Sequence, residues 1–427
     1  MSPNPKLGSL EISGGEHCVQ TLGSEGTYKP APVRRLGIIG GGQLGMLLCR
    51  AARDLGITTT VLTPDTSAPA VHETDHILLA DYDDPTALNQ LILCCDVITF
   101  EFEAVPDSTI ERLQEAIERR EAKVQPEPKT LARLKDKGLQ KRWLLDNGLP
   151  TLPFKLTDKS TRATDLLSGP LSLPLVQKAR TGGYDGKGVQ VLTEEADLAA
   201  LWPIPGLVEP MLDNCTEVAV VVASDGRGAL RAYPPVHMAF DPQLNAVRTV
   251  TTPATIEPRI QLSCDTIARD AVRRLGSAGV FAVELFVTAK GEVFINELSP
   301  RVHNSGHLTL DAFKCDQFEQ HLRAIAGLPL GQIVARAPAA AMLNLLYDDS
   351  MAPALAPYPY TRRLDAQGHT FLHWYGKRAP KPGRKMGHIT ALAMSGEAAL
   401  LQAENGLAKV QAGDLGDEYD EPRAIAS

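Results

Sequence analysis

The stretch FAVELFVTAKGEVFINELSP, residues 281–300, decides how the rest of the chain is interpreted. Its two strand-like runs, Phe281–Thr288 and Val293–Leu298, predict a β-hairpin. A turn centred on Lys290-Gly291, with a two- or a four-residue loop, places Glu284 directly opposite Glu297. Their Cβ atoms would then lie roughly 5 Å apart.

The two glutamates would face each other as like charges, which is destabilising unless something compensates. A divalent cation between them would do so, and oxygen ligands suit Mg²⁺ that also binds the phosphates of a substrate. Asn296 adds an oxygen beside Glu297. The alternative is an exposed hairpin edge with solvated carboxylates. The next loop, with Arg301, His303 and Asn304, favours a site, because it gathers polar groups without an apolar period.

A second polar segment is the glycine-rich loop TGGYDGKG, residues 181–188. It lies between two predicted strands, and its Gly186-Lys187 pair lacks the following Ser or Thr of a Walker A loop. Glycines let backbone N–H groups approach phosphate oxygens closely. The pattern predicts a mobile flap over a triphosphate, with Lys178 placed for a phosphate. An ordinary flexible hairpin is the alternative.

Near the N-terminus, Gly40-x-Gly42-x-x-Gly45 follows a predicted strand and opens a predicted helix. In isolation this pattern fits a dinucleotide fingerprint, with Asp65 at a suitable distance for a ribose hydroxyl. Its physics requires only a helix N-terminus that receives an anionic group. A tight turn without a ligand also remains open.

The most basic segment is HWYGKRAPKPGRKMGH, residues 373–388. It holds five cations between Lys377 and Lys385, and its Gly and Pro residues are incompatible with a long helix. A solvated basic loop and a clamp for a substrate phosphate are the two interpretations.

The length of 427 residues indicates two or three domains. Alternating strands and helices predict an α/β domain over residues 34–125. Residues 126–208 combine a linker helix with a small β-rich flap module, and residues 209–412 form a larger α+β unit. Residues 1–33 and 413–427 are expected to be tails, the first of them disordered. The individual elements predicted are strands at Leu36–Ile39, Thr58–Leu62, Val97–Phe100, Leu175–Lys178, Val189–Leu192 and Val218–Ala223, and helices at Leu44–Leu55, Lys129–Asn147, Thr266–Leu275 and Ala312–Ala326.

Composition narrows the classes of protein that fit. A formal net charge of −8 disfavours a nucleic-acid surface, which needs a basic footprint. The seven Cys residues include no CxxC pair, so neither a disulfide framework nor a zinc site is indicated, and a reducing cytoplasm is expected. The sequence shows no apolar run near the ~18 residues of a membrane span and no signal peptide.

Together these segments resemble the 5-(carboxyamino)imidazole ribonucleotide synthases, a family of ATP-grasp ligases in purine biosynthesis. The matching pieces are, in family order, GIIGGGQLG (37–45), TFEFEAVP (99–106), KARTGGYDGKG (178–188), INELSPRVHNSGH (295–307) and HWYGK…PGRKMGH (373–388). Five motifs in order, over about residues 35–390, make the resemblance specific. It implies an ATP-grasp fold, α/β and α+β, with an N-terminal Rossmann-like domain, a small flap domain and a C-terminal ATP-grasp domain.

The resemblance also implies a reaction. ATP would activate bicarbonate as carboxyphosphate, and the exocyclic amine of aminoimidazole ribonucleotide would capture the carboxyl group, leaving ADP and phosphate. The expected ligands are these substrates and Mg²⁺, with Mn²⁺ as an alternative ion. The expected assembly is a homodimer that binds neither nucleic acid nor membrane.

Roles for individual residues follow from the same resemblance. The metal ligands would be Glu284 and Glu297. The ATP-binding residues would be Arg133, Lys178, Tyr184, Asp185, Gly186, Lys187, Gly188, Glu209, Pro210, Met211, Leu212, Glu217, His237, Asn296 and Glu297. The catalytic residues would be Asp185, Arg301, His303, Asn304 and Lys377, with the guanidinium of Arg301 suited to planar bicarbonate. The ribonucleotide-binding residues would be Gln43, Glu101, Tyr184, Asp185, Lys377, Arg384 and Lys385.

Three rival functions remain. One is another ATP-grasp ligase, such as a formate-dependent glycinamide ribonucleotide transformylase, which shares the phosphate and metal logic. Another is an NAD-dependent oxidoreductase built on the glycine turn at residues 40–45. The third is a catalytically inactive nucleotide-binding regulator.

Overall fold

The structure is a computed structural model that describes residues 33–167, 171–183, 188–348, 356–378 and 380–415. The predicted tails, residues 1–33 and 413–427, lie outside this part of the chain except for Val33 and 413–415. The described strands form three sheets, of four, four and ten strands. None of the described helices is long and apolar enough to cross a membrane.

The first sheet is fully parallel and has the strand order β3-β2-β1-β4. The predicted strands and helix in this region are confirmed, with small changes at their ends. The sheet and its helices comprise β1 (Arg35–Ile39), α1 (Gln43–Asp54), β2 (Thr58–Thr63), the 3₁₀ helix η1 (Pro69–His72), β3 (His76–Leu79), α2 (Pro85–Cys94), β4 (Val97–Phe100) and α3 (Asp107–Glu118).

The linker helix differs from the prediction. In place of one helix over Lys129–Asn147, the chain forms α4 (Pro128–Lys135) and α5 (Lys137–Asp146). Asp136 between them is extended, with φ −99° and ψ 106°, and its carboxylate accepts hydrogen bonds from the first amides of α5. An Asp cap of this kind starts a new helix, so the single-helix prediction is wrong.

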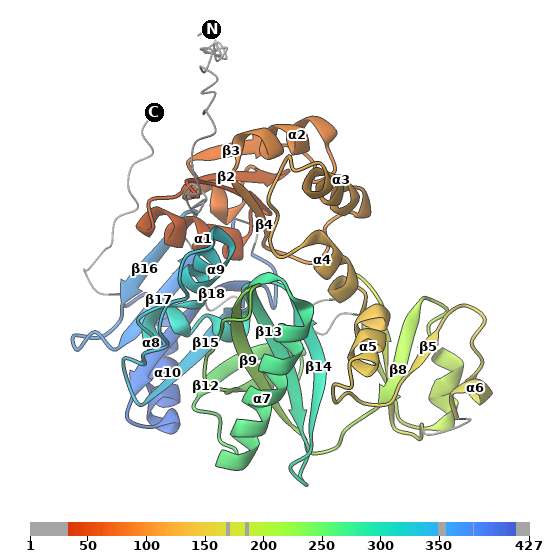
Figure 1. The fold of residues 1–427 in the computed structure, drawn as a ribbon. Helices are drawn as coiled ribbons and strands as arrows, with labels where there is room; N and C mark the ends of the chain where they lie inside the picture. The colour runs from red at the N-terminus through yellow and green to blue at the C-terminus, as the bar shows by residue number, and fades with distance from the viewer. Residues whose placement is uncertain (1–32, 168–170, 184–187, 349–355, 379, 416–427) are drawn as a thin grey trace, which may run out of the picture. The chain divides into compact units, whose positions relative to one another are not determined.

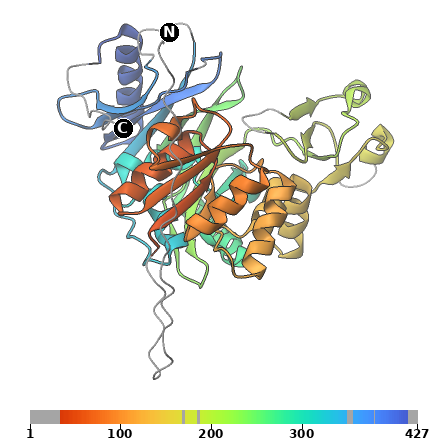
Figure 2. The ribbon, with the colours of Figure 1, turned by 90° about the horizontal axis from the view of Figure 1, so that it is seen from above.

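The second sheet is antiparallel and has the order β5-β8-β6-β7. The glycine-rich loop joins β6 to β7, as predicted, although residues 184–187 of the loop lie outside the described part of the chain. The elements are β5 (Lys155–Thr157), α6 (Ala163–Leu167), β6 (Leu175–Ala179), β7 (Val189–Leu192), η2 (Glu195–Ala200) and β8 (Gly206–Pro210), drawn in yellow and yellow-green in Figure 2.

The third sheet runs in the order β14-β13-β9-β11-β12-β15-β18-β17-β16, with β10 beside β9. Its strands are β9 (Thr216–Asp225), β10 (Leu230–Ala232), β11 (Val236–Asp241), β12 (Ala246–Thr252), β13 (Ala278–Val287), β14 (Val293–Ser299), β15 (Ala339–Leu346), β16 (Pro359–Arg363), β17 (Thr370–Tyr375) and β18 (Lys385–Ala393). Its helices are α7 (Pro258–Leu275), η3 (Asn304–Gly306), α8 (Thr309–Ala312), α9 (Gln317–Ala326) and α10 (Gly396–Ala412).

Two predicted helices in this unit have different bounds. The predicted helix Thr266–Leu275 is the C-terminal half of α7, which begins eight residues earlier with Pro at its first turn. The predicted helix Ala312–Ala326 is wrong over its first residues, because Asp316 caps α9 by accepting hydrogen bonds from the N–H groups of Phe318 and Glu319.

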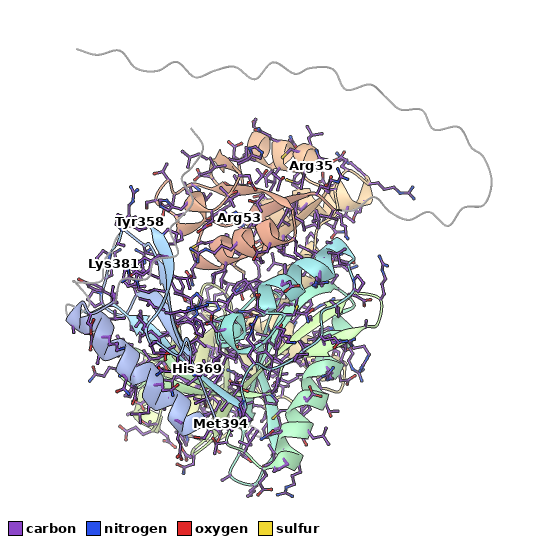
Figure 3. All side chains as sticks on the ribbon, turned by 90° about the vertical axis from the view of Figure 1, so that its left-hand side faces the viewer. Arg35, Arg53, Tyr358, His369, Lys381 and Met394 are labelled. Atoms are coloured by element: carbon purple, nitrogen blue, oxygen red, sulfur yellow. The ribbon has the colours of Figure 1, made fainter. Side chains whose placement is uncertain are left out.

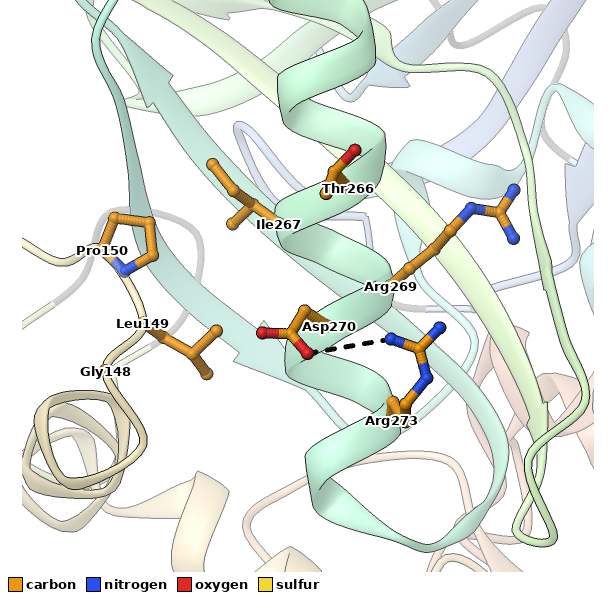
Figure 4. Close-up of a pocket in the computed structure, with 8 residues that line it drawn as sticks. All are labelled: Gly148, Leu149, Pro150, Thr266, Ile267, Arg269, Asp270 and Arg273. Carbon is orange, nitrogen blue, oxygen red and sulfur yellow. Dashed lines mark ion pairs between the residues drawn. The ribbon is translucent and has the colours of Figure 1, made fainter.

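Helix α7 covers one face of β9, β13 and β14 (Figure 1). Val283 and Leu285 share a hydrophobic core with α7, so Glu284 between them points to the opposite face. A hollow of about 320 Å³ lies between α7 and the segment after α5 (Figure 4). None of the predicted site residues lines this hollow.

The basic stretch joins β17 to β18. Figure 3 shows Tyr358 and Lys381 at one end of β16–β18 and His369 and Met394 at the other. The predicted basic loop therefore lies at one end of the large sheet.

Candidate active site

The hairpin of β13 and β14 pairs Glu284 directly with Glu297, as the sequence predicted. The loop itself is different, because Thr288 and Glu292 close a three-residue turn with Gly291 at φ +80°. Nearer the turn, Leu285 pairs with Ile295, which leaves Asn296 as an extra residue in β14. This β-bulge restores the predicted pairing of the glutamates, whereas the predicted two- or four-residue loop is wrong.

The bulge breaks the alternation of side chains along β14. Ile295 and Leu298 are buried in the core shared with α7, while Asn296 and Glu297 are both half-buried and both contact lysines. The Nδ2 atom of Asn296 lies 3.5 Å from Oε2 of Glu284. Three oxygen-bearing side chains thus gather on one face of the hairpin, which an unbroken strand would separate.

The electrostatic environments of the two glutamates differ sharply. Burial, together with the nearby carboxylates of Glu297 and Glu217, raises the pKa of Glu284 to about 8. Burial acts on Glu297 in the same direction, but contact with the ammonium of Lys137 and the charge of Lys178 hold the pKa of Glu297 at about 2. The pair therefore lacks positive charge on the Glu284 side.

This arrangement fits a divalent cation. Glu284 and Glu297 offer carboxylate oxygens, which suit Mg²⁺, and Oδ1 of Asn296, which accepts from Lys178 in this structure, is a third oxygen nearby. Burial and the neighbouring carboxylates raise the pKa of Glu284 despite the charges of Lys137 and Lys178, the direction expected for a carboxylate whose charge the protein does not fully compensate. A cation beside Glu284 would compensate this charge, and it would also lower this pKa.

Of the two basic residues predicted for the ATP phosphates, Lys178 contacts this cluster, whereas Arg133 packs on an aromatic ring. The guanidinium carbon of Arg133 lies 5.8 Å from the ring centroid of Trp143. Lys137, at the start of α5, contacts Glu297. The break at Asp136 sets the direction of α5 and of Lys137, which adds Lys137 to the candidates for an ATP contact, while the contact predicted for Arg133 stays a prediction.

A second buried ion network adjoins the first. Glu209, at the end of β8, pairs with Lys178 at 2.6 Å and with Lys141 of α5 at 2.7 Å. Burial opposes the charge of Glu209, yet the two lysines hold its pKa at about 2. Lys178 also donates to Oδ1 of Asn296 at 2.7 Å, so it bridges the second sheet and the hairpin.

Sequence reasoning missed Lys137 and Lys141. Both belong to α5, and their spacing of four residues places them on one helix face. This spacing could have pointed to the two lysines, but a single helix predicted over Lys129–Asn147 does not distinguish them from its other basic residues.

The other predicted nucleotide residues lie on strands around this network. Glu217 of β9 shares its sheet face with Glu284, and burial and the charge of Glu297 raise its pKa. His237 of β11 pairs with Val218, one residue after Glu217.

The remaining predicted nucleotide residues belong to the glycine loop or follow β8. Gly188 is the last residue of the glycine loop, and its carbonyl accepts a hydrogen bond from the N–H of Ala179. Pro210, Met211 and Leu212 follow Glu209, and Tyr184, Asp185, Gly186 and Lys187 lie outside the described residues.

Two residues predicted for bicarbonate lie beside the carboxylate pair. Nε2 of His303 is 3.5 Å from Oε1 of Glu284, and Nε of Arg301 is 2.7 Å from Oε2 of Glu103. Nδ1 of His303 accepts from the N–H of Ser305, which leaves its proton on Nε2. Burial and the charge of Arg301 lower the pKa of His303 to about 4, so the ring is a neutral donor near pH 7.

Asn304 is held differently. Its Nδ2 donates to Oδ1 of Asn344 at 2.9 Å, and Nδ2 of Asn344 donates to Oδ1 of Asn304 at 2.8 Å. Asn344 is buried and also donates to the carbonyl of Val247. This reciprocal pair occupies part of the hydrogen-bonding capacity of Asn304 and favours a positioning role over a direct catalytic one.

The glycine turn at the start of α1 receives an anion from the protein itself. The carboxylate of Glu101, just after β4, accepts from the N–H groups of Gly42 at 2.5 Å and Gly45 at 2.7 Å. A Cβ atom on Gly42 would lie 2.6 Å from Oε1 of Glu101. The pyrophosphate of a dinucleotide would need the same amides, so the oxidoreductase rival loses the feature on which it rested. Gln43 lies at the first turn of α1, half-buried beside this contact.

The basic stretch is ordered around Lys377. Nζ of Lys377 donates to the carbonyl of Lys385 at 2.7 Å and lies 5.3 Å from the ring centroid of Tyr375. Its charge also reaches Glu101, where it opposes the rise in pKa that burial causes. Lys385 is buried and Arg384 half-buried, so a fully solvated loop does not describe these cations.

Family comparisons agree with this geometry. Residues 33–134 match the ribonucleotide synthetase preATP-grasp domain, residues 142–318 the ATP-grasp domain, and residues 340–402 the phosphoribosylaminoimidazole carboxylase C-terminal domain. The fold and site together define an ATP-grasp ligase.

Individual relatives narrow the family. The chain is 40% identical to the N5-carboxyaminoimidazole ribonucleotide synthase of Synechococcus elongatus, over 90% of this chain and 96% of the relative. It is 37% identical to that of Brucella melitensis, over 84% and 97%. The chain belongs to the N5-carboxyaminoimidazole ribonucleotide synthase family, another name for the family that its motifs resemble.

Solved structures give the same result. An ADP complex of an N5-carboxyaminoimidazole ribonucleotide synthetase has a TM-score of 0.78 and 33% identity, covering 88% of this chain and 97% of that one. The Aspergillus clavatus enzyme in complex with ADP and 5-aminoimidazole ribonucleotide has a TM-score of 0.76 and 28% identity, covering 89% and 99%.

Proposed function

We propose that this chain carboxylates 5-aminoimidazole ribonucleotide with bicarbonate and ATP, giving 5-carboxyaminoimidazole ribonucleotide, ADP and phosphate in purine biosynthesis. The observation that carries the proposal is the oxygen cluster of Glu284, Asn296 and Glu297, flanked by Lys137 and Lys178. The family to which the chain belongs and the ligands of the two structural relatives support it.

The nucleotide phosphates lie, in this proposal, against the hairpin. Lys137 and Lys178 neutralise phosphate charge, and Glu284 and Glu297 would hold Mg²⁺ or Mn²⁺, with Asn296 beside them. The bound cation would supply electrostatic stabilisation of the transferring phosphoryl group. The adenine and ribose lie along Glu209–Leu212 and Glu217, with His237 nearby.

Bicarbonate lies between this centre and the loop of Arg301 and His303. A bicarbonate oxygen attacks the γ-phosphorus and ADP leaves, which forms carboxyphosphate. The neutral Nε2–H of His303 and the guanidinium of Arg301 stabilise the added negative charge. Glu103 holds Arg301 in place, and the glycine loop 181–188 excludes water that would hydrolyse the acyl phosphate.

The ribonucleotide lies on the other side of the bicarbonate. Gln43 and Glu101 bind its base and ribose, together with Tyr184 and Asp185 of the glycine loop. Lys377, Arg384 and Lys385 bind its phosphate. The amine nitrogen attacks the carboxyl carbon, phosphate leaves and the amine loses a proton, for which Asp185 is the proposed acceptor.

The proposal also covers the domain boundaries, the oligomeric state and the cellular location of the protein. We place the first domain boundary at residue 125, between the first and second sheets, and move the second from the expected residue 208 to Pro210, because β8 of the second sheet ends there. A homodimer in the cytoplasm fits the family resemblance and the absence of CxxC pairs. Sedimentation equilibrium tests the dimer.

An ADP-release assay tests the function. We expect release to depend on both aminoimidazole ribonucleotide and bicarbonate, and formate not to replace bicarbonate. Release supported by formate would favour the transformylase rival, and no release would favour an inactive regulator.

A further inference from the structure

Buried aromatic rings form a cluster behind the basic loop. His373 and Tyr375 come from β17, His388 from β18, and His307 from the turn before α8. His307, Tyr375 and His388 are completely buried and His373 is 6% exposed. Polar rings are costly to bury without partners, so their presence here needs a physical reason.

The cluster forms a continuous chain of contacts from α8 to the basic loop. Nε2 of His373 lies 2.8 Å from the Asp311 carboxylate, and both side chains are less than 10% exposed. The ring of His373 stacks on that of His388, with centroids 4.5 Å apart and planes within 10°. Nδ1 of His388 lies 2.7 Å from the hydroxyl of Tyr375.

One further contact links Tyr375 to Lys377, a residue of the proposed substrate site. The ammonium of Lys377 lies 5.3 Å from the centroid of the Tyr375 ring, within the range of a cation–π interaction. The ammonium of Lys377 also donates a hydrogen bond to the carbonyl of Lys385. The aromatic face of Tyr375 and this carbonyl together restrict where the ammonium can lie.

A metal ion is the competing explanation for the cluster. One ligand atom from each of Asp311, His373 and His388 can be chosen so that all three lie within 4.8 Å of one another. A metal lies close to the plane of each imidazole that binds it, however, and two parallel stacked rings have no common plane. The bond to Tyr375 also engages one nitrogen of His388. The observed geometry is therefore that of a packed support.

His307 packs against His388 and Tyr375 from the side on which bicarbonate is proposed to bind. Its ring is 5.1 Å from His388 and edge-on to Tyr375 at 6.4 Å. Nε2 of Gln317 donates to the carbonyl of His303 at 2.7 Å and lies 3.1 Å from Nδ1 of His307. Gln317 and His307 thus link the backbone of His303 to the ring of Tyr375.

We propose that Tyr375 is a positioning residue that orients Lys377 for the phosphate of aminoimidazole ribonucleotide, and that His388, His373 and Asp311 hold Tyr375 in place. The proposal rests on the proposed function, because it takes the ribonucleotide as the ligand of Lys377. Tyr375 itself touches no substrate in this account.

Calorimetric titration of aminoimidazole ribonucleotide into the ADP-bound protein tests the proposal. We expect Tyr375→Leu, which removes the π face, to raise the dissociation constant about tenfold, in the middle of the range for cation–π contacts. Tyr375→Phe keeps the face and should raise it only about twofold. In a Lys377→Met background, Tyr375→Leu should have no further effect, because the two residues act through one contact.

Tyr360→Leu is the matched control, because Tyr360 is buried on the neighbouring strand β16 and stacks on Trp374. We expect a similar drop in melting temperature with an unchanged dissociation constant. An unchanged constant in Tyr375→Leu, or an equal effect in the Lys377→Met background, would overturn the proposal. Stoichiometric transition metal in the purified protein would do the same. Wild-type protein that fails to bind the ribonucleotide would instead overturn the proposed function.

Discussion

Glu284 and Glu297 lie directly opposite each other on β13 and β14, yet their pKa values shift in opposite directions. Lys137 contacts Glu297, whereas Glu284 lies 3.5 Å from the amide of Asn296 and 3.5 Å from the ring of His303. The hairpin therefore carries one compensated and one uncompensated carboxylate. In the proposed function, a divalent cation bound with the nucleotide phosphates would supply the missing positive charge.

Replacing Glu297 by Gln removes one of the two proposed metal ligands and the negative charge that Lys137 contacts. We expect turnover to fall by a factor on the order of a thousand or more, in line with the loss of a preorganised electrostatic contact. Steady-state ADP release over a range of Mg²⁺ concentrations measures this. Glu292→Gln, an exposed change on the same hairpin, serves as the control, and activity restored by saturating Mg²⁺ would refute the assignment.

Substitutions of Lys137 and Arg133 show which of the two residues contacts ATP. Lys137→Met should lower kcat/KM for ATP by about 10- to 100-fold, the value of a charge-assisted hydrogen bond. Arg133→Met should change it less than about twofold, because Arg133 packs on Trp143. If Arg133→Met lowered kcat/KM for ATP more than Lys137→Met, Arg133 rather than Lys137 would be the residue that contacts ATP.

The comparison of Lys137 with Arg133 shows where sequence reasoning succeeds and fails. The pairing of Glu284 with Glu297 could be predicted, because strand periodicity and a short turn constrain it tightly. The bulge at Asn296 could not, since a two-residue loop and a three-residue loop with a bulge give the same pairing. The direction of Lys137 depends on a helix break at Asp136, which helix propensity alone does not mark.

Contacts between residues far apart in the sequence could not be predicted either. The carboxylate of Glu101 occupies the glycine turn of α1 from 56 residues away, and Asn344 pairs with Asn304 from 40 residues away. Both contacts exist only once the sheets have formed, and both change the roles of residues that the motifs singled out.

Lys385 belongs to the proposed phosphate clamp for the ribonucleotide. Lys385→Ala should raise KM for the ribonucleotide about tenfold and leave the KM for ATP unchanged, if it binds ground state and transition state equally. Lys381→Ala, an exposed change in the same loop, is the control. An effect confined to the KM for ATP would mean that the clamp lies elsewhere.

His321 makes folding stability depend on pH. Its Nδ1 accepts from the N–H of Val280 and its Nε2 lies 2.8 Å from the hydroxyl of Thr99, so the buried ring is neutral. Burial lowers its pKa to about 3. Between the ordinary pKa of about 6.5 and this value, the unfolded chain binds a proton that the folded chain does not. Stability therefore falls as pH decreases, by about 1.4 kcal/mol per pH unit.

Urea unfolding at pH 7 and pH 5 measures this effect. Wild type should lose about 2 kcal/mol more than His321→Gln over this interval, since the variant lacks the titrating ring. The other buried histidines are common to both proteins and cancel in the difference. An equal loss in both would show that His321 does not control the dependence.

The most direct test of the carboxylation chemistry follows oxygen from bicarbonate into phosphate. With ¹⁸O-labelled bicarbonate, aminoimidazole ribonucleotide and ATP, we expect one ¹⁸O in each phosphate released, because a bicarbonate oxygen attacks the γ-phosphorus and stays with it. Phosphate free of label, formed together with ADP, would show that bicarbonate is not the phosphoryl acceptor and would contradict the account.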